Sequence, residues 1–422
     1  MRNYKLSYGK TILDLNIPDQ IQVDLIEPID LPPLENPVEE VKHSLEHPIG
    51  ISLDTLVRPS CTVAIAVNDK TRPVPHKYIL PPLLEKLLSL GVKKNNIFIY
   101  IATGTHLPMD VDEIRSILPR EIVDHYQITS HNCDDDNKLR YLGKTTKGTD
   151  AYANTYYYKS NIKIVTGNIE PHHFMGYSGG VKSAAIGLAG RQTINTNHAM
   201  LIDDNSRFGL FESNPMRQDI EEIGRMMGID FALNVILNSQ KNIARVFSGD
   251  PLMVMNSGIS LVKEKCQVII NNPYDLVIAS AGGYPKDINL YQSQKALTHA
   301  SAVVRNGGVI IITAECSEGS GSLAFQEFME GVSSYKQAIE KFSATGFRVG
   351  PHKAFQIARE AANKTIILVS NLPSDSVRNW LMTPAPSIEE AMNIALSILP
   401  DNPSVAVMPR ATNTIPEISV DN

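Results

Sequence analysis

The chain has 422 residues, of which 43% are hydrophobic and 20% are charged, and its formal net charge is −6. A single hydrophobic core stops growing at roughly 250–300 residues, so this length predicts two domains. The negative charge and the lack of a stretch rich in Lys and Arg exclude an electrostatic basis for nucleic-acid binding. No segment resembles a signal peptide or reaches the roughly 20 apolar residues of a membrane span, so we expect a cytoplasmic protein without a membrane partner.

The first half of the chain predicts a hairpin followed by alternating helices and strands. Short alternating apolar runs mark the hairpin, and an Asn-Pro pair before a charged periodic segment marks the first helix. Continuous apolar runs such as CTVAIAV are typical of buried parallel strands. The predicted elements are strands at 4–8 and 12–17, a helix after Asn36-Pro37, a strand at 61–67, a helix at 76–90, strands at 97–102, 162–167 and 231–237, and a helix at 251–265. This order indicates an α/β domain.

The second half repeats the pattern of strand followed by helix. Its predicted strands are at 275–283, 307–315 and 365–371. This pattern predicts a small doubly wound parallel sheet. We place the domains at residues 1–270 and 271–399. A strand at 404–410, in the tail 400–422, either completes the second sheet or returns to the first domain, and the sequence leaves both arrangements open.

The four cysteines are scattered and lack the C-x-x-C spacing of a zinc ribbon. They are Cys61, Cys133, Cys266 and Cys316. The acidic triplet 134–136 could suggest a cation site, but calcium prefers spaced oxygen ligands. A solvated acidic loop is therefore the simpler interpretation.

Four polar loops directly follow predicted strands. They lie at 68–73, 102–108, 167–187 and 281–295. Ligands of α/β folds bind outside the carboxyl ends of strands and often between domains. The predicted fold class is therefore α/β, with two α/β domains and an active-site cleft between them.

The loop at 167–187 is the densest in polar groups. Within eleven residues it holds His172, His173, Ser178, Gly179, Gly180 and Lys182. Glycines before a helix expose backbone N–H groups that suit a phosphate. The loop matches neither the Walker pattern G-x-x-x-x-G-K-[ST] nor the dinucleotide pattern G-x-G-x-x-G, which disfavours an ordinary NAD-dependent dehydrogenase.

Three histidines, His106, His172 and His198, lie on the predicted loops or near helix starts. Imidazole carries protons near neutral pH and also binds borderline metals, although a single histidine on a helix is usually structural. In an extended His172-His173 pair the rings point to opposite sides, so we expect only one of them to face a substrate.

Two basic residues, Arg72 and Lys295, could recognise an anion. Arginine offers a planar fork for a carboxylate or phosphate, and lysine offers a point charge. Surface ion pairs are the alternative role for both.

Five motifs together resemble the nickel-dependent lactate racemase family. They are D-K-T-R-P (69–73), A-T-G-T-H (102–106), G-N-I-E-P-H-H-F-M-G-Y-S-G-G-V-K-S-A-A-I-G-L-A-G (167–190), N-x-N-H (195–198) and Y-Q-x-x-K (291–295). The resemblance extends through the whole chain, and the segment at 167–190 is its most specific part.

The resemblance implies a nickel pincer nucleotide, a Ni(II)-pyridinium-3,5-bisthiocarboxylic acid mononucleotide, bound by the first domain. It implies covalent attachment at Lys182, nickel coordination by His198, and acid/base roles for His106 and His172. It further implies cofactor contacts from Asp69, Lys70, Thr71 and Arg72, and substrate contacts from Arg72, Tyr291, Gln292 and Lys295. Cofactor-synthesis proteins are the implied maturation partners.

The implied activity is interconversion of D- and L-lactate through pyruvate. Hydride removal avoids the very unstable carbanion that loss of the Cα proton would create beside a carboxylate. Two histidines are needed because the enantiomers present their hydroxyls to opposite walls. A racemase or epimerase of another 2-hydroxy acid is the first alternative, followed by a zinc hydrolase that uses the three histidines and a carrier of a metallated nucleotide.

Overall fold

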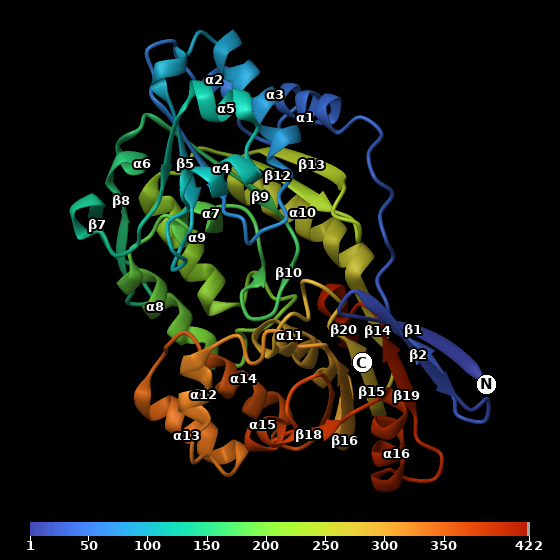
Figure 1. Cartoon of the computed structure of the whole chain (residues 1–422). Coiled ribbons are helices and arrows are strands. Elements are labelled where there is room, and N and C mark those ends of the chain that lie inside the picture. Colours follow the sequence, from blue (N-terminus) through green and yellow to red (C-terminus); the bar gives the residue numbers. More distant parts are fainter. Residues whose placement is uncertain (420–422) are drawn as a thin grey trace. The chain divides into compact units, whose positions relative to one another are not determined.

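The computed structural model describes residues 1–419, and its contacts divide the chain into two units. The central unit is Asp30–Lys265. The terminal unit is Met1–Ile29 together with the chain from Cys266 onward. Figure 1 shows the elements of both. Within residues 1–419, no helix has both the length and the apolar character needed to cross a membrane.

The central unit is built on a six-stranded sheet. In spatial order its strands are β13 (Ile243–Gly249), β12 (Phe231–Leu237), β9 (Ile162–Asn168), β4 (Val63–Asn68), β5 (Ile97–Ala102) and β6 (Gln127–Ser130). All neighbours are parallel except β13, which runs antiparallel to β12. The expected strands β4, β5, β9 and β12 thus lie side by side.

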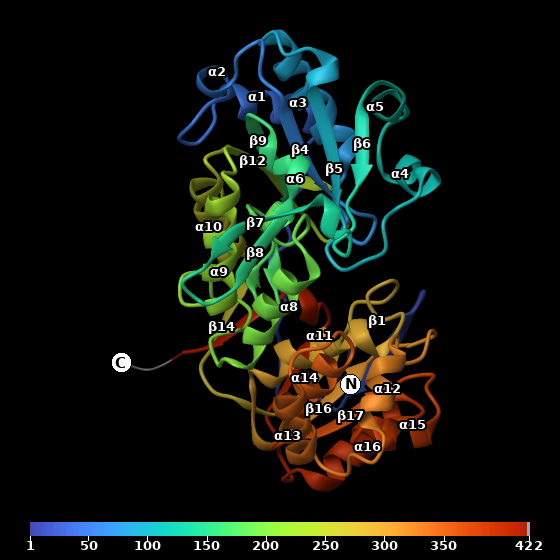
Figure 2. The same cartoon turned by 90° about the vertical axis from the view of Figure 1, so that its left-hand side faces the viewer.

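Helices cover both faces of this sheet, because its strands are apolar on both faces. Val63, Ile65 and Val67 of β4 pack in one core with α1 (Pro37–Glu46) and α3 (His76–Ser89). On the opposite face α7 (Lys182–Ala185) contacts β4 and β9, and α9 (Pro215–Met227) packs on α7. Figure 2 shows α1 and α3 on one side of the sheet and α9 on the other.

The remaining elements of the central unit surround this sheet. They are α2 (Leu53–Leu56), α4 (Val111–Ile117), α5 (Arg120–His125), α6 (Thr155–Lys159), α8 (Arg191–Ala199), α10 (Pro251–Cys266), the hairpin of β7 (Leu139–Lys144) and β8 (Asp150–Asn154), and the hairpin of β10 (Pro171–His172) and β11 (Gly176–Tyr177).

The strand order of the central sheet reverses at β4. The chain moves from β4 to β5 and β6 on one side, and then returns to place β9 on the other side of β4. Such a switch point opens a crevice outside the carboxyl ends of the two strands, where ligands of doubly wound folds bind.

The terminal unit contains a second six-stranded sheet, in which every pair is parallel. Its order is β18 (Thr383–Ala385), β17 (Thr365–Val369), β16 (Val304–Thr313), β15 (Tyr274–Ser280), β19 (Val405–Met408) and β3 (Val23–Leu25). One face is covered by the hairpin of β1 (Arg2–Tyr8) and β2 (Thr11–Ile17) and by α16 (Ile388–Ile398). The predicted α/β class with a doubly wound C-terminal sheet is confirmed.

The other face of the terminal sheet carries α11 (Leu290–Ser301), with α14 (Pro351–Ala361) packed on it. The further elements of this unit are α12 (Leu323–Met329), α13 (Tyr335–Thr345), α15 (Ser374–Asn379), and the pair β14 (Gln267–Ile270) and β20 (Ile415–Ile418).

The first residues of the chain belong to a different unit from the one predicted by the division into 1–270 and 271–399. Residues 1–29 belong to the terminal unit, because Leu6, Leu15 and Ile17 of the hairpin are buried on its sheet. The strand predicted at 404–410 is β19, which pairs with β15 and so completes the terminal sheet. Residues 420–422 of the predicted tail lie outside the described residues.

Candidate functional site

The loops after β4, β5 and β9 leave one edge of the central sheet, since these three strands are parallel neighbours. The first carries Asp69 to Arg72, the second His106, and the third His172 and Lys182. His198 lies near the end of α8, in the same unit. A hydrogen bond from Gly104 N–H to Gly187 O (3.0 Å) connects the second loop to the segment after α7.

Asp69 and His106 connect the first loop of this edge to the second. His106 Nδ1 lies 2.6 Å from Asp69 Oδ2. Burial raises the pKa of Asp69, but hydrogen bonds from His106 and Thr71 outweigh it and leave this pKa below its usual value. An ionised Asp69 accepts the Nδ1 proton, so Nε2 of the half-exposed His106 is left as the proton acceptor.

The other residues of the D-K-T-R-P loop differ in their contacts. Thr71 donates from its N–H (3.1 Å) and hydroxyl (2.6 Å) to Asp69 Oδ1, which closes a tight turn. Lys70 forms an ion pair with Glu113 on α4, and this pairing raises the pKa of Lys70. Arg72 makes no ion pair within residues 1–419, so its guanidinium is available for an anion.

His172 and His173 stack on each other, with ring centroids 4.7 Å apart. The expectation that the two rings point to opposite sides is therefore wrong. Strand β10 ends at His172, so the alternation of an extended strand does not continue to His173. The Phe174 ring packs edge-on against His172 (4.6 Å), His173 (4.3 Å) and His198 (5.7 Å) and gathers them in one cluster.

His198 is held as a neutral imidazole. Burial, and then the positive charge of Lys182, lower the pKa of His198 to about 3. The second cause also shows that Lys182 and His198 lie near each other. Metals bind the neutral ring, so this environment suits a metal ligand. Among residues 1–419, no three His, Cys, Asp or Glu side chains form a metal-binding group, and the structure gives no support to a three-histidine zinc site.

The helix after Gly179-Gly180 is a single turn, α7, which ends at Ala185. A Cβ on Gly187 would lie 2.2 Å from Ser183 O and 2.5 Å from Ala102 Cβ. Close packing against β5 therefore accounts for this glycine. The acidic loop at 134–136 is held by ion pairs of Asp134 with Arg191 and of Asp135 with Lys138.

Sequence reasoning gave no role to three asparagines, although Asn168 lies within the motif at 167–190. Asn68 and Asn168 end β4 and β9, and Asn234 lies in the middle of β12. Asn168 Nδ2 and Asn234 Nδ2 are buried and have no hydrogen-bond partner among residues 1–419, and the same holds for Asn68 Oδ1. Asn68 Oδ1 and Asn234 Oδ1 would lie 3.2 and 3.6 Å from a Cβ on Gly167. These amides therefore place polar groups beside β4 and β9, where the strand order reverses.

Sequence reasoning also missed a function for His76, which begins α3. This histidine is buried, and its Nε2 lies 3.0 Å from Asn68 O. Burial lowers the pKa of His76 to about 4, so the neutral ring donates its Nε2 proton to that carbonyl. His76 therefore anchors the end of β4 directly before Asp69.

The predicted substrate residues of the terminal unit occupy the first turns of α11. Asn289 caps this helix by accepting from Gln292 N–H (3.0 Å), and Lys295 Nζ donates to Gln292 Oε1 (2.6 Å). The Tyr291 ring packs edge-on against His352, with centroids 5.6 Å apart, and Lys353 Nζ lies 4.8 Å from its centre. Burial and the charge of Lys295 lower the pKa of Lys353.

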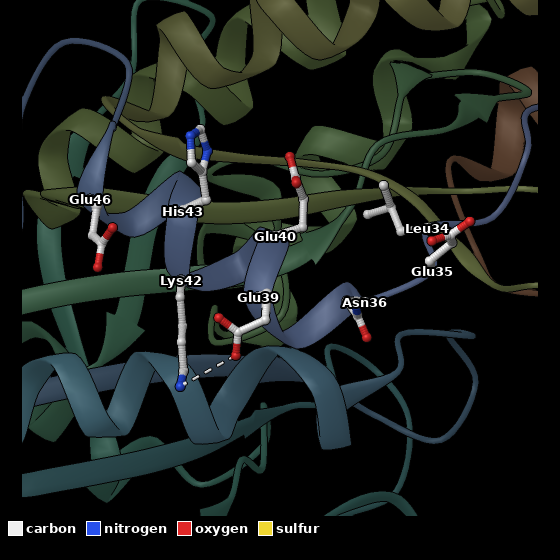
Figure 3. A pocket seen from close by; sticks show the side chains of 8 residues that line it. All are labelled: Leu34, Glu35, Asn36, Glu39, Glu40, Lys42, His43 and Glu46. Carbon is white, nitrogen blue, oxygen red and sulfur yellow. Dashed lines mark ion pairs between the residues drawn. The ribbon is translucent and has the colours of Figure 1, made fainter.

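A surface hollow of about 520 Å³ lies beside α1 and is lined by residues between 34 and 46. Figure 3 shows its lining, in which Glu39 pairs with Lys42. A second hollow, of about 780 Å³, lies in the terminal unit between 20–26 and 268–274. Neither is lined by a predicted site residue, so neither is the candidate site.

Comparison with known proteins agrees with the motifs in both units. The profile of the lactate racemase N-terminal domain matches residues 8–209, and that of the lactate racemase C-terminal domain matches residues 269–415. A lactate racemase of Thermoanaerobacterium thermosaccharolyticum is 32% identical over 424 residues, which covers 98% of this chain and 99% of that protein. The chain belongs to the lactate racemase family. It is therefore a racemase, an enzyme of the isomerase class.

One further relative and two solved structures match over most of their length. A lactate racemase of Lactiplantibacillus plantarum is 32% identical over 89% of this chain and 90% of its own. The apoprotein structure of the T. thermosaccharolyticum enzyme covers 99% of this chain and all of its own, with a TM-score of 0.93 and 30% identity. A Thermotoga maritima protein, at 17% identity and a TM-score of 0.68, shares the fold.

Proposed function

We propose that this racemase interconverts D- and L-lactate through pyruvate, with a nickel pincer nucleotide attached to Lys182. The observation that supports the proposal best is the position of Lys182 beside His198, whose imidazole is kept neutral. A neutral imidazole can bind a metal, and the amine of Lys182 beside it can form a covalent bond to a cofactor. Both residues lie in the motifs that resemble the lactate racemase family.

The residues present fit such a cofactor. Two buried amide N–H₂ groups, of Asn168 and Asn234, have no partner among residues 1–419, and buried donors of this kind usually have one. A side chain on Gly179 or Gly180 would collide with buried neighbours such as Asn234 and Met255, so glycine at both positions keeps the loop that carries Lys182 packed against them. The D-K-T-R-P loop adds Arg72, whose guanidinium suits a phosphate or carboxylate.

When bound, the cofactor would supply the acceptor for the hydride that leaves the substrate Cα. Lys182 would hold it covalently and His198 would bind its nickel. Asp69, Thr71 and Arg72 belong to the loop that would contact it, whereas Lys70 is paired with Glu113 in this structure. We keep Lys70 as a cofactor contact only on the family resemblance.

His106 and His172 are the proposed acid/base pair. Nε2 of His106 would take the hydroxyl proton of one enantiomer, with Asp69 fixing the tautomer and stabilising the imidazolium that forms. His172 would do the same for the other enantiomer from the opposite wall. Its ring is held by packing against His173 and Phe174, which keeps its direction constant.

The carboxylate of the substrate would be held by basic and polar side chains. We propose Arg72 and Lys295 as its charged partners, and Gln292 and Tyr291 as neighbours that orient Lys295 and close the pocket. Anchoring the carboxylate keeps the reacting carbon in place while the planar keto acid turns. Whether these groups meet in a cleft between the two units stays a prediction.

The test is stereochemical inversion combined with mass spectrometry. Protein produced in cells that also contain the cofactor-synthesis proteins should carry an adduct on Lys182 and racemise single-enantiomer lactate. Lys182→Ala should lose both properties, while Lys163→Ala, a second largely buried lysine of the central unit, should keep the adduct. Full activity with an unmodified Lys182 would falsify the covalent proposal.

The first alternative is another 2-hydroxy acid as substrate. The ring of Tyr291, a proposed substrate neighbour, lies against His352 and Lys353. These polar side chains would suit a 2-hydroxy acid whose side chain is larger or more polar than the methyl group of lactate. A panel of single-enantiomer 2-hydroxy acids, followed by optical rotation, decides between the substrates. A zinc hydrolase would keep its metal in Lys182→Ala, and a cofactor carrier would tolerate loss of His106 and His172.

A further inference from the structure

We propose that Arg217 and Asn234 clamp the peptide between Gly179 and Gly180 and thereby position Lys182 for attachment of the cofactor. Both residues lie in the central unit, Arg217 on α9 and Asn234 in β12, and neither belongs to the motifs at 69–73, 102–106, 167–190 or 195–198. The inference rests on the proposed role of Lys182. It assigns Arg217 and Asn234 as positioning residues.

Arg217 is an arginine with no solvent-exposed surface. Its Nη1 donates to Tyr177 O and Gly179 O, each at 3.2 Å, and its Nη2 donates to Gly179 O at 3.2 Å. Its Nε and Nη2 also donate to Glu221 Oε1 at 2.9 and 2.5 Å, and the Phe211 ring lies 4.9 Å from the guanidinium carbon. A buried charge is tolerated only when it is paired and hydrogen-bonded, and here every contact is directed at the loop or at its own counter-ion.

Asn234 holds the other side of the same peptide. Gly180 N–H donates to Asn234 Oδ1 at 2.9 Å. The carbonyl of Gly179 and the N–H of Gly180 belong to one peptide group, so both of its polar atoms are bound by buried side chains from different elements. The flanking φ values of +94° and +60° are accessible to glycine, and without the two bonds this peptide would be free to rotate.

The packing around the peptide matches the clamp. A Cβ on Gly180 would lie 3.1 Å from Arg217 Nη2, and one on Gly179 would lie 2.7 Å from Asn234 Oδ1. Gly224 of α9 similarly allows Val181 to approach, since its Cβ would lie 2.6 Å from that of Val181. Val181 and Lys182 follow the clamped peptide directly, so its orientation sets where the Lys182 side chain starts.

The same helix holds a second part of this loop. Asn214, the N-cap of α9, donates to Phe174 O at 2.9 Å. Phe174 contacts His172 and His198, so α9 fixes the loop at both the histidine cluster and the lysine. Lysine could not replace Arg217, because a single ammonium cannot bind two carbonyls and a carboxylate in this planar arrangement.

The experiment compares Arg217→Lys and Asn234→Ala with the control Arg225→Lys, an exposed arginine on the same helix. In apoprotein, peptide-level hydrogen exchange should accelerate at least tenfold at 178–185 in the first two variants, with α1 and β5 unchanged. Protein made together with the cofactor-synthesis proteins should show a several-fold lower occupancy of Lys182 by mass spectrometry. The double variant should add little to either single one, since both bonds restrain one peptide.

Three results would overturn the clamp. These are unchanged exchange at 178–185, accelerated exchange spread evenly over the whole central unit, or accelerated local exchange with full occupancy of Lys182. Failure of the proposed function is a separate result. Wild-type protein would then carry no adduct on Lys182, while the exchange data would still decide whether Arg217 and Asn234 hold this peptide.

Discussion

The two units hold their functional side chains in different ways. In the central unit most candidate groups lie in the segments that follow strands, with Lys182 on the short helix α7 and His198 on α8. These segments are held by buried polar bonds such as those of Asp69 and Arg217. In the terminal unit they lie on one helix, α11, at positions 291, 292 and 295. Positions 291 and 295 are i,i+4 and positions 292 and 295 are i,i+3, so the helix backbone itself brings Lys295 near each of the other two side chains.

This difference predicts where substitutions act. A loop can aim side chains in directions that no helix offers, but its geometry depends on partners that are distant in sequence. A helix is self-supporting, so loss of one neighbour should change its geometry little. The following changes test this contrast from the largest expected effect to the smallest.

Replacing the acid/base histidines should have the largest effect. His106→Asn and His172→Asn should each lower the rate of lactate racemisation by roughly 10²–10⁴-fold, because a positioned proton carrier contributes about that factor. Gln292→Ala on α11 should lower kcat/KM by only about tenfold, since Lys295 keeps its charge. Polarimetry with each pure enantiomer measures this. Equal losses for all three variants would contradict the division of roles.

Removing the partner of His106 should have the next largest effect. In Asp69→Asn the amide cannot stabilise an imidazolium, and kcat/KM should fall by roughly 10–100-fold with little change in folding stability. The tautomer of His106 can be followed by nitrogen NMR. Retention of the Nδ1-protonated form in Asp69→Ala, which offers no acceptor at this position, would show that Asp69 does not fix the tautomer.

Acid should destabilise both units through their buried histidines, among them His76 in the central unit and His299 in the terminal unit. Burial lowers the pKa of His76 and of His299 from 6.5 to about 4, so the unfolded chain binds more protons between these values. Stability is therefore complete above pH 6.5 and decreases as the pH falls towards 4, by about 1.4 kcal/mol per pH unit for each histidine.

Urea unfolding between pH 7 and pH 4.5 measures this dependence. His76→Gln should reduce the dependence for the central unit, where buried His198 still contributes, and His299→Gln should reduce it for the terminal unit, whereas the exposed His125→Gln serves as the control. A pH dependence that stays the same in His76→Gln would show that this group does not titrate on unfolding.

Removing the helix cap should have the smallest effect. Asn289→Ala deletes the acceptor for Gln292 N–H and should cost about 1 kcal/mol of unfolding free energy, with kcat/KM reduced only a few-fold. Thermal unfolding and steady-state kinetics report the two quantities. A loss of activity as large as that of Asp69→Asn would show that α11 is not self-supporting.

Local pattern in the sequence determined most of the elements of this protein and the candidate catalytic and cofactor-binding residues, but not the buried residues that support them. Continuous apolar runs predicted β4, β5, β9 and β12, because a parallel strand covered on both faces must be apolar throughout. Polar loops after those strands contained Asp69, His106, His172 and Lys182, and the motifs placed the chain in its family.

Only the tertiary structure decided which of these parts are neighbours. The return of β9 to the side of β4, the pairing of residues 23–25 with β19, and the stacking of His172 on His173 depend on contacts between residues far apart or on the end of a short strand. The clamp is the clearest case, since 38 residues separate Arg217 from Gly179 and 54 separate Asn234 from Gly180. A buried side chain that binds a backbone carbonyl leaves no periodic signal, because its partner can have any side chain.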